Sequence, residues 1–307
     1  MRKEHNQRIN PPQLFDQFRK ASAVFGASLV IGSTVMAGIV PNGVNLQPSY
    51  YNGGNPNLGF SLMNQNSKIR TCRIEIEPDK VSQAKSWISQ ARSNGKTVIA
   101  TYHKASVLGS DSTTELNNAG NWWRNNYATL NASGSFTVNL INEWGSHNIS
   151  SSSFASAYNN AISLVRQRYS GRIIIDCAGW GQETTRMRAA ISGSGTRIND
   201  GNIAASVHIY PNGWNQGANH TLQTSDLDHL NGAGRPCIVG EFGNSPSGGA
   251  NWSALVDRAK SLGWPVLGWA WNGDGGSMNM CSPSWRSSPG ATSFSKSGHF
   301  NTIYNKL

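Results

Sequence analysis

The sequence has 307 residues and a formal net charge of +10, and only 14% of its residues are charged. Hydrophobic residues make up 37% of the chain, which excludes a disordered protein because disordered chains are poor in such residues. A collagen-like chain and a coiled coil are also excluded, since there is neither a Gly-X-Y period nor a long heptad run. The 11 tryptophans and the scarcity of charge suit a protein that binds a neutral polar ligand with an apolar face, such as a sugar.

The N-terminal segment predicts export. Five basic residues precede an uncharged stretch over residues 21–38 (ASAVFGASLVIGSTVMAG), which has small residues near its end. This pattern is typical of a secretory signal peptide over residues 1–37, with residues 38–307 as the mature domain. A retained membrane anchor and a buried helix are the alternatives, but glycine and serine dilute the run and it is short for a membrane span. We therefore expect a secreted protein with no membrane association after cleavage.

Charge and cysteine patterns narrow the possible partners. Lys and Arg form no cluster in the mature region, so the positive charge gives no reason to expect a nucleic-acid partner. No C-x-x-C spacing links Cys72, Cys177, Cys237 and Cys281, so a structural zinc site is not expected. An exported protein could pair these cysteines, yet three of them lie in or beside apolar runs, where a free thiol acts as a small hydrophobe. The sequence leaves their disulfide state open.

Eight short apolar runs, rich in β-branched and aliphatic residues, predict strands buried on both faces. They cover residues 43–47, 72–76, 97–102, 136–141, 172–176, 203–209, 236–240 and 266–271.

Amphipathic stretches with helical spacing lie between several of these runs, over residues 81–91, 116–130, 154–165 and 252–262. Ser153 is a candidate cap for the third stretch, and residues 150–153 and 245–249 are interpreted as loops. Eight strands alternating with helices over about 270 residues predict an α/β fold, a single-domain (β/α)8 TIM barrel. A doubly wound sheet is the alternative, but the first strand lacks the Gly-rich phosphate loop typical of that fold.

Two glutamates follow strands of this predicted barrel. Glu143 comes after the fourth strand and Glu241 after the seventh, at the strand ends where TIM barrels carry their chemistry. Hydrolysis of a glycosidic bond needs two carboxyl groups, one to protonate the leaving oxygen and one to attack the anomeric carbon or activate water. The alternative is that each glutamate caps a helix or pairs with an arginine.

Polar and aromatic residues near other strand ends fit such a site. Arg73 lies on the second strand, where a guanidinium could hold a nucleophilic carboxylate ionised. The others are His103 after the third strand, Asn142 beside Glu143, His208 and Tyr210 on the sixth, and Trp271 on the eighth as a flat face for a sugar ring.

Taken together, LINEWG (140–145), VHIY (207–210), VGEFG (239–243) and GWAW (268–271), with Arg73 and His103, resemble glycoside hydrolase family 5. The resemblance implies a retaining hydrolase with Glu143 as acid/base and Glu241 as nucleophile. It further implies that Asn142 contacts the sugar 2-hydroxyl, Tyr210 donates to Glu241, and His208 lines the same subsite. No cofactor is implied.

The segments 173–182 and 268–276 look most like the bacterial endo-β-1,4-mannanase branch, and place Trp180 beside the cleft. Lys104 stands where those mannanases usually have an aspartate, so endo-β-1,4-glucanase of the same family is the nearest alternative. The expected partner is a β-1,4-linked polysaccharide or oligosaccharide, bound by a monomer.

Two other functional classes stay open. A non-catalytic carbohydrate-binding barrel would also explain the tryptophans, among them Trp214 on the loop after the sixth strand, a candidate for sugar stacking. A metal-dependent hydrolase would use His103 and His208, but the chain has neither H-x-H nor H-E-x-x-H spacing. We therefore expect no metal.

Overall fold

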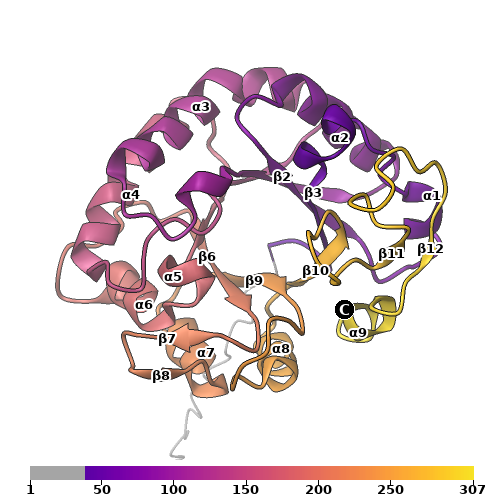
Figure 1. Cartoon of the computed structure of the whole chain (residues 1–307). Coiled ribbons are helices and arrows are strands. Elements are labelled where there is room, and N and C mark those ends of the chain that lie inside the picture. The colour runs from indigo at the N-terminus through magenta and orange to yellow at the C-terminus, as the bar shows by residue number, and fades with distance from the viewer. Residues whose placement is uncertain (1–38) are drawn as a thin grey trace, which may run out of the picture. The chain divides into compact units, whose positions relative to one another are not determined.

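Eight parallel strands close into a barrel in the computed structural model, which describes residues 39–307 (Figure 1). The order around the barrel is β1, β2, β3, β4, β5, β6, β9 and β10, and β10 pairs with β1 to close it. The strands are Gly43–Leu46 (β1), Thr71–Ile76 (β2), Thr97–Tyr102 (β3), Thr137–Asn139 (β4), Ile173–Asp176 (β5), Ile203–Ile209 (β6), Cys237–Phe242 (β9) and Val266–Asn272 (β10). This confirms the predicted (β/α)8 barrel. The predicted signal peptide lies outside the described residues and stays a prediction.

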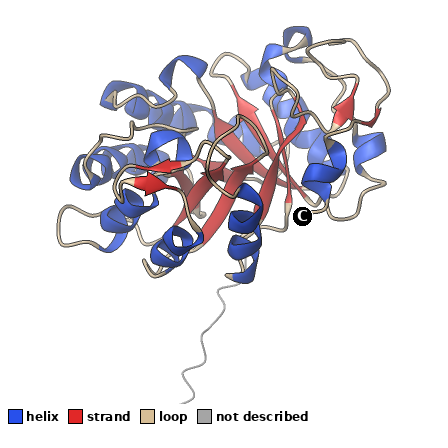
Figure 2. Ribbon diagram, turned by 60° about the horizontal axis from the view of Figure 1, so that its bottom comes forward, coloured by secondary structure: helices blue, strands red, loops and turns tan. Residues whose placement is uncertain are grey.

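Helices surround the barrel on its outside, as Figures 1 and 2 show. They are Phe60–Met63 (α1), Val81–Ser93 (α2), Thr113–Asn131 (α3), Ser151–Arg166 (α4), Thr184–Ser192 (α6), Thr224–Asn231 (α7), Trp252–Ser261 (α8) and Phe300–Tyr304 (α9). The short helix Ala178–Gly181 (α5) lies inside this ring, directly after β5 (Figure 1). Short 3₁₀ turns occur at Pro48–Tyr50, Asn52–Gly54 and Ala105–Val107, and two small hairpins pair Trp214–Asn215 (β7) with His220–Thr221 (β8) and Cys281–Ser282 (β11) with Ser295–Lys296 (β12).

The four predicted amphipathic stretches are confirmed as α2, α3, α4 and α8. The predicted cap of α4 was wrong, because the helix begins three residues earlier. Ser150 is the N-cap, and its side chain accepts a hydrogen bond from the backbone N–H of Ser153. Residues 151–153 therefore form the first turn of α4 rather than a loop, since a serine hydroxyl satisfies an otherwise unpaired N–H there.

The barrel interior changes from apolar to polar along its axis. Ile99, Ile174, Ile238 and Leu267 belong to a small core cluster separate from the main core, which lies between strands and helices. Because side chains alternate along a strand, this cluster fills the barrel itself. Toward the carboxyl ends of the barrel strands, buried polar side chains replace them, including Asn139 on β4, Asp176 on β5 and His208 on β6. The barrel interior is therefore apolar at its base and polar at the carboxyl ends of the strands.

All four cysteines are buried and none forms a disulfide, which answers the question that the sequence left open. Across residues 39–307, no helix is both long and apolar enough to cross a membrane.

Candidate active site

A cleft of about 530 Å³ opens at the carboxyl ends of the barrel strands. Six of the ten predicted site residues line it: His103, Asn142, Glu143, Trp180, Tyr210 and Glu241. The other lining residues are Gln47, Leu108, His147, Gln182, Asn212, Ser245, Pro246, Trp269 and Met278. The cleft therefore lies at the strand ends where these residues were predicted.

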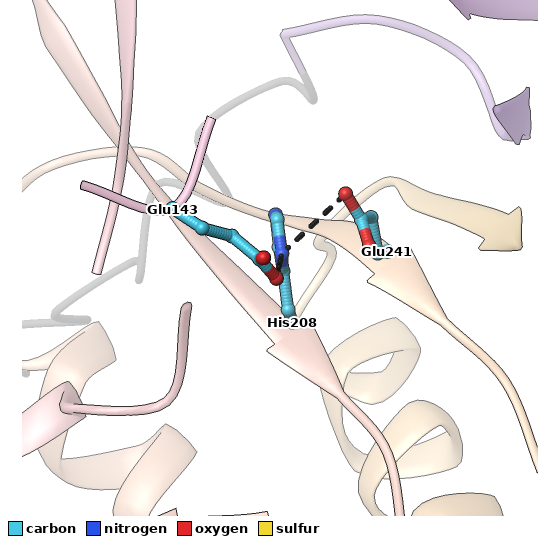
Figure 3. A group of neighbouring side chains, drawn as sticks. All are labelled: Glu143, His208 and Glu241. Atoms are coloured by element: carbon cyan, nitrogen blue, oxygen red, sulfur yellow. Dashed lines mark hydrogen bonds and ion pairs between the residues drawn. The ribbon is translucent and has the colours of Figure 1, made fainter. Parts of the chain in front are cut away.

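Glu143 and Glu241 converge in this cleft from different parts of the barrel (Figure 3). Glu143 follows β4, whereas Glu241 lies on β9, 98 residues later in the chain. One carboxylate oxygen from each and a ring nitrogen of His208 all lie within 4.8 Å of one another. Two carboxyl groups this close can act on one bound sugar ring.

Two hydrogen bonds hold the Glu241 carboxylate. Arg73 Nη1 donates to Oε1 at 2.9 Å, and the Tyr210 hydroxyl donates to Oε2 at 2.7 Å. Burial opposes the charge of Glu241, but the positive charges of His208 and Arg73 and the Tyr210 hydrogen bond outweigh it, so its pKa is lowered. Glu241 is therefore an ionised carboxylate with a fixed orientation.

Glu143 has the opposite electrostatic character. Burial is the largest influence on this carboxyl and raises its pKa, and the negative charge of Glu241 adds to the effect. The hydrogen bond from His208 Nδ1 to Oε1, at 2.7 Å, only partly offsets it. A raised pKa keeps a proton available for transfer, as a general acid requires.

The backbone of Glu143 adopts a left-handed conformation with a φ of 50°. This conformation is costly for a residue other than glycine and persists only where neighbours hold it. Asp176 Oδ2 accepts from the Glu143 N–H at 3.2 Å, and the Glu143 carbonyl accepts from the Gly109 N–H at 2.8 Å. Asp176 ends β5 and was not among the predicted site residues.

His208 lies below the cleft rather than lining it, which corrects its predicted place. Burial disfavours its charge, but Glu241, Asp176 and Glu143 together raise its pKa well above the ordinary value. Its Nε2 lies 3.6 Å from Asp176 Oδ2, and the pKa of Asp176 is lowered to about 2 because the His208 charge outweighs the effect of burial. His208 is therefore an imidazolium that holds Glu143 from beneath.

Glu143, His208 and Glu241 are close enough to ligate a metal ion. His208 Nδ1, however, already donates to Glu143, and a charged imidazolium offers no lone pair at that nitrogen. Metal binding here would first require His208 to lose a proton that Glu241, Asp176 and Glu143 together stabilise. The donor set thus favours an ion-pair network over a metal site.

Arg73 lies beneath the cleft, as the predicted partner of the nucleophile. Its Nη2 also donates to the amide oxygen of Asn142, which leaves the Asn142 amide nitrogen as a donor at the cleft surface. One guanidinium therefore positions both residues.

Trp271 was predicted as the sugar platform, and this was wrong. Its side chain is fully buried, and its indole N–H donates to the Leu58 carbonyl at 2.9 Å. Trp269 lines the cleft instead. The pairing of β10 with β1 is irregular between Gly268 and Asn272, so simple alternation cannot be counted through the segment that contains both tryptophans.

The three large hydrophobic side chains that are exposed in the described part of the chain are Tyr50, Trp180 and Trp214, and each follows a barrel strand at the mouth. Trp180 lines the cleft, and its ring lies 5.4 Å from that of His147. A Cβ on Gly109 would come within 2.5 Å of the Trp180 ring, so a glycine is needed there. Trp214 is 36% exposed but does not line the cleft.

We expect Trp180→Ala to raise KM on a long substrate about tenfold, with a smaller change in kcat. Loss of one exposed aromatic face removes about 1–2 kcal/mol of ligand burial, and about 1.4 kcal/mol corresponds to tenfold in affinity. Trp214→Ala is the matched control, because it removes the same side chain outside the cleft lining. Steady-state kinetics on a soluble polysaccharide measures both, and an unchanged KM for Trp180→Ala would remove this residue from the binding surface.

Comparisons with known proteins agree with this geometry. The model of the family Cellulase (glycosyl hydrolase family 5) matches residues 50–275. Mannan endo-1,4-beta-mannosidase of Streptomyces lividans is 29% identical over 204 residues, which are 64% of this chain and 51% of that protein. The chain thus spans about half the length of this relative.

Solved structures share the fold at low sequence identity. The catalytic domain of a mannanase from Streptomyces sp. SirexAA-E has a TM-score of 0.66 at 20% identity, covering 87% of this chain and 85% of that one. The catalytic domain of the Thermobifida fusca endoglucanase Cel5A has a TM-score of 0.68 at 17% identity, covering 87% and 90%. The family model spans well over half of the sequence, and the protein therefore belongs to glycosyl hydrolase family 5.

Proposed function

We propose that this glycoside hydrolase is a retaining endo-β-1,4-mannanase, with Glu241 as the nucleophile and Glu143 as the acid/base. The observation that carries the proposal is the pair of carboxyl groups that bring one oxygen each within 4.8 Å of the other, one group with a lowered and one with a raised pKa. Retaining glycosidases place these groups about 5–5.5 Å apart, whereas inverting enzymes need about 6.5–9.5 Å to admit a water.

The two steps follow from this arrangement. In the first, Glu241 forms a bond to the anomeric carbon while the glycosidic bond breaks, and the Glu143 proton passes to the leaving oxygen. In the second, Glu143 takes a proton from water, the water oxygen bonds to the anomeric carbon, and the ester to Glu241 breaks. Arg73 and Tyr210 orient the Glu241 carboxylate before the first step, and they stabilise its negative charge when the carboxylate forms again in the second step.

Support for mannan comes from the curated mannanase relative, and support for an oligosaccharide substrate comes from related structures. A β-mannanase from Streptomyces thermolilacinus has been solved with mannohexaose, and Cel5A with cellotetraose. Those ligands belong to those proteins. Mannose and glucose differ in the orientation of one hydroxyl, and proteins with this fold act on either sugar. An assay therefore decides which of the two this enzyme prefers.

A panel of substrates tests the proposal: mannan, glucomannan, carboxymethylcellulose and defined β-1,4-linked oligosaccharides, with product analysis. We expect internal cleavage of mannan and glucomannan, with little release from carboxymethylcellulose. Faster cleavage of carboxymethylcellulose would instead identify an endoglucanase. Binding of oligosaccharide with no release of reducing ends would identify a non-catalytic barrel.

The pKa directions predict a bell-shaped dependence of kcat/KM on pH. Activity needs Glu241 ionised and Glu143 protonated, so it should fall on the acid side as the carboxylates around Glu241 take up protons. It should fall on the basic side as Glu143 loses its proton, at a pH above the usual range of a glutamate because its pKa is raised. A profile that stays flat from mildly acidic to alkaline pH contradicts the assignment, and activity unaffected by a chelator would exclude a required metal.

A further inference from the structure

A third glutamate, Glu75, lies under the cleft and has no role in the two steps above. It is on β2, two residues after Arg73, so both side chains point into the barrel. Its side chain is only 1% exposed. A carboxylate is costly to bury unless it is well paired, so its position must be explained by what it contacts.

One oxygen of Glu75 shares a donor with the nucleophile. Arg73 Nη1 lies 2.9 Å from Glu75 Oε1, 2.9 Å from Glu241 Oε1 and 2.9 Å from Asn45 Oδ1. A guanidinium NH₂ has two protons, so three acceptors compete for them. The hydrogen bond that Arg73 gives to Glu241 therefore depends on how strongly Glu75 accepts.

The other oxygen of Glu75 faces two side chains of the cleft wall. Gln47 Nε2 donates to Oε2 at 2.7 Å, and His103 Nε2 lies 3.5 Å from the same oxygen. Gln47 follows β1, His103 follows β3, and both line the cleft. A single carboxylate thus connects the arginine under the nucleophile to two residues that can contact the sugar.

We propose that Glu75 is a positioning residue, which tunes the charge of Glu241 through Arg73 and orients Gln47 and His103 toward the bound sugar. The inference rests on the proposed function of the cleft. Only a carboxylate fits this position, because both of its oxygens accept hydrogen bonds. A glutamine here would have one acceptor oxygen, so its NH₂ group would face the donor of either Arg73 or Gln47 and could not bond to it.

The surroundings of Glu75 favour a proton-sensitive carboxyl. Burial raises the pKa of Glu75 to about 7, and the Glu241 charge adds to this, while His103, Arg73 and the Gln47 hydrogen bond partly offset it. Besides these groups, Tyr50 and Tyr210 also lie close enough to feel its charge. The ionised form, which accepts from both donors, is therefore lost as the pH falls.

The test is Glu75→Gln, with kcat/KM measured against pH on the oligosaccharide that the panel selects. We expect a loss of roughly tenfold to a hundredfold at the wild-type optimum, as for a buried donor left unpaired. The acid limb should move to lower pH by on the order of half a unit or more, because a titrating group is gone and Glu241 loses a like-charged neighbour. Glu115→Gln is the control, since Glu115 pairs with Lys104 outside the cleft lining and should leave both quantities unchanged.

Gln47→Leu provides an independent test on a side chain that is only half-buried, should Glu75→Gln not fold. It removes a hydrogen bond that favours the ionised Glu75, so the acid limb should move to higher pH, opposite to Glu75→Gln. Wild-type kcat/KM and pH profile in a folded Glu75→Gln, or no upward shift in Gln47→Leu, would overturn the inference. If the alanine variants of Glu143 and Glu241 lose activity as expected, either of these results rejects only the role of Glu75 and leaves the proposed function intact. Full activity in those variants would instead reject the proposed function.

Discussion

Glu241→Ala should lower kcat by roughly 10⁴-fold or more on the substrate that the panel selects, because the proposed function makes Glu241 the group that forms the covalent intermediate. No neighbouring side chain can replace it. Glu75 lies beneath the cleft lining. Glu143 is hydrogen-bonded to His208, and its raised pKa favours the protonated form, which is not a nucleophile. Arg73 keeps Glu75 and Asp176 as partners in the variant, so we expect the fold to survive the change. Kinetics on that substrate, with thermal unfolding to verify folding, gives the result.

Azide separates loss of a nucleophile from loss of shape. The Glu241→Ala variant has space for a small anion beside Arg73, on the face of the sugar that Glu241 attacks. With an activated aryl glycoside, azide should restore turnover by bonding to the anomeric carbon from that face while the phenolate leaves, so the product is inverted. Glu115→Ala is the control, because it removes a glutamate outside the cleft lining. Near-wild-type activity of Glu241→Ala, or a rescued product of retained configuration, contradicts the nucleophile role.

The barrel could be predicted from the sequence because its strands leave a strong local signal. Several of them are buried on both faces and have a nearly continuous aliphatic sequence, such as Ile173–Asp176, and helical stripes separate the runs. Two glutamates following two of these runs were enough to locate the cleft. Helices α6 and α7 were missed, since they are short and their stripes are weak, at Thr184–Ser192 and Thr224–Asn231.

The parts of the site that the sequence did not predict depend on contacts between distant segments. Trp269 and Trp271 stand two residues apart, yet only one lines the cleft, because β10 pairs irregularly with β1 between Gly268 and Asn272 and the alternation is broken there. Asp176 ends β5 with no local sign that its carboxylate holds the backbone of Glu143. Glu75 did leave a signal: it alternates with Arg73 on one strand, so an acid on the same face of β2 could have been recognised.

Glu143→Ala should affect the two chemical steps differently, and this difference identifies the acid/base. In a polysaccharide substrate the leaving oxygen needs a proton, so we expect kcat to fall by about 10²–10⁴-fold. An aryl glycoside with an acidic phenol needs no proton to leave, so its first step should remain fast while the attack of water slows. A burst of phenol should therefore precede slow turnover, and the basic limb of the pH profile should disappear because the group that it reports is gone.

The burst distinguishes the roles of the two glutamates, since Glu241→Ala cannot form the ester and should show none. Azide should accelerate turnover of Glu143→Ala as well, but here it enters where water does, on the face opposite the ester, so the product keeps its configuration. Glu143→Gln keeps the side-chain volume next to His208 while removing the titrating carboxyl, and should behave like the alanine variant if proton transfer is what matters. A wild-type basic limb in either variant would assign that limb to another group and remove Glu143 from the acid/base role.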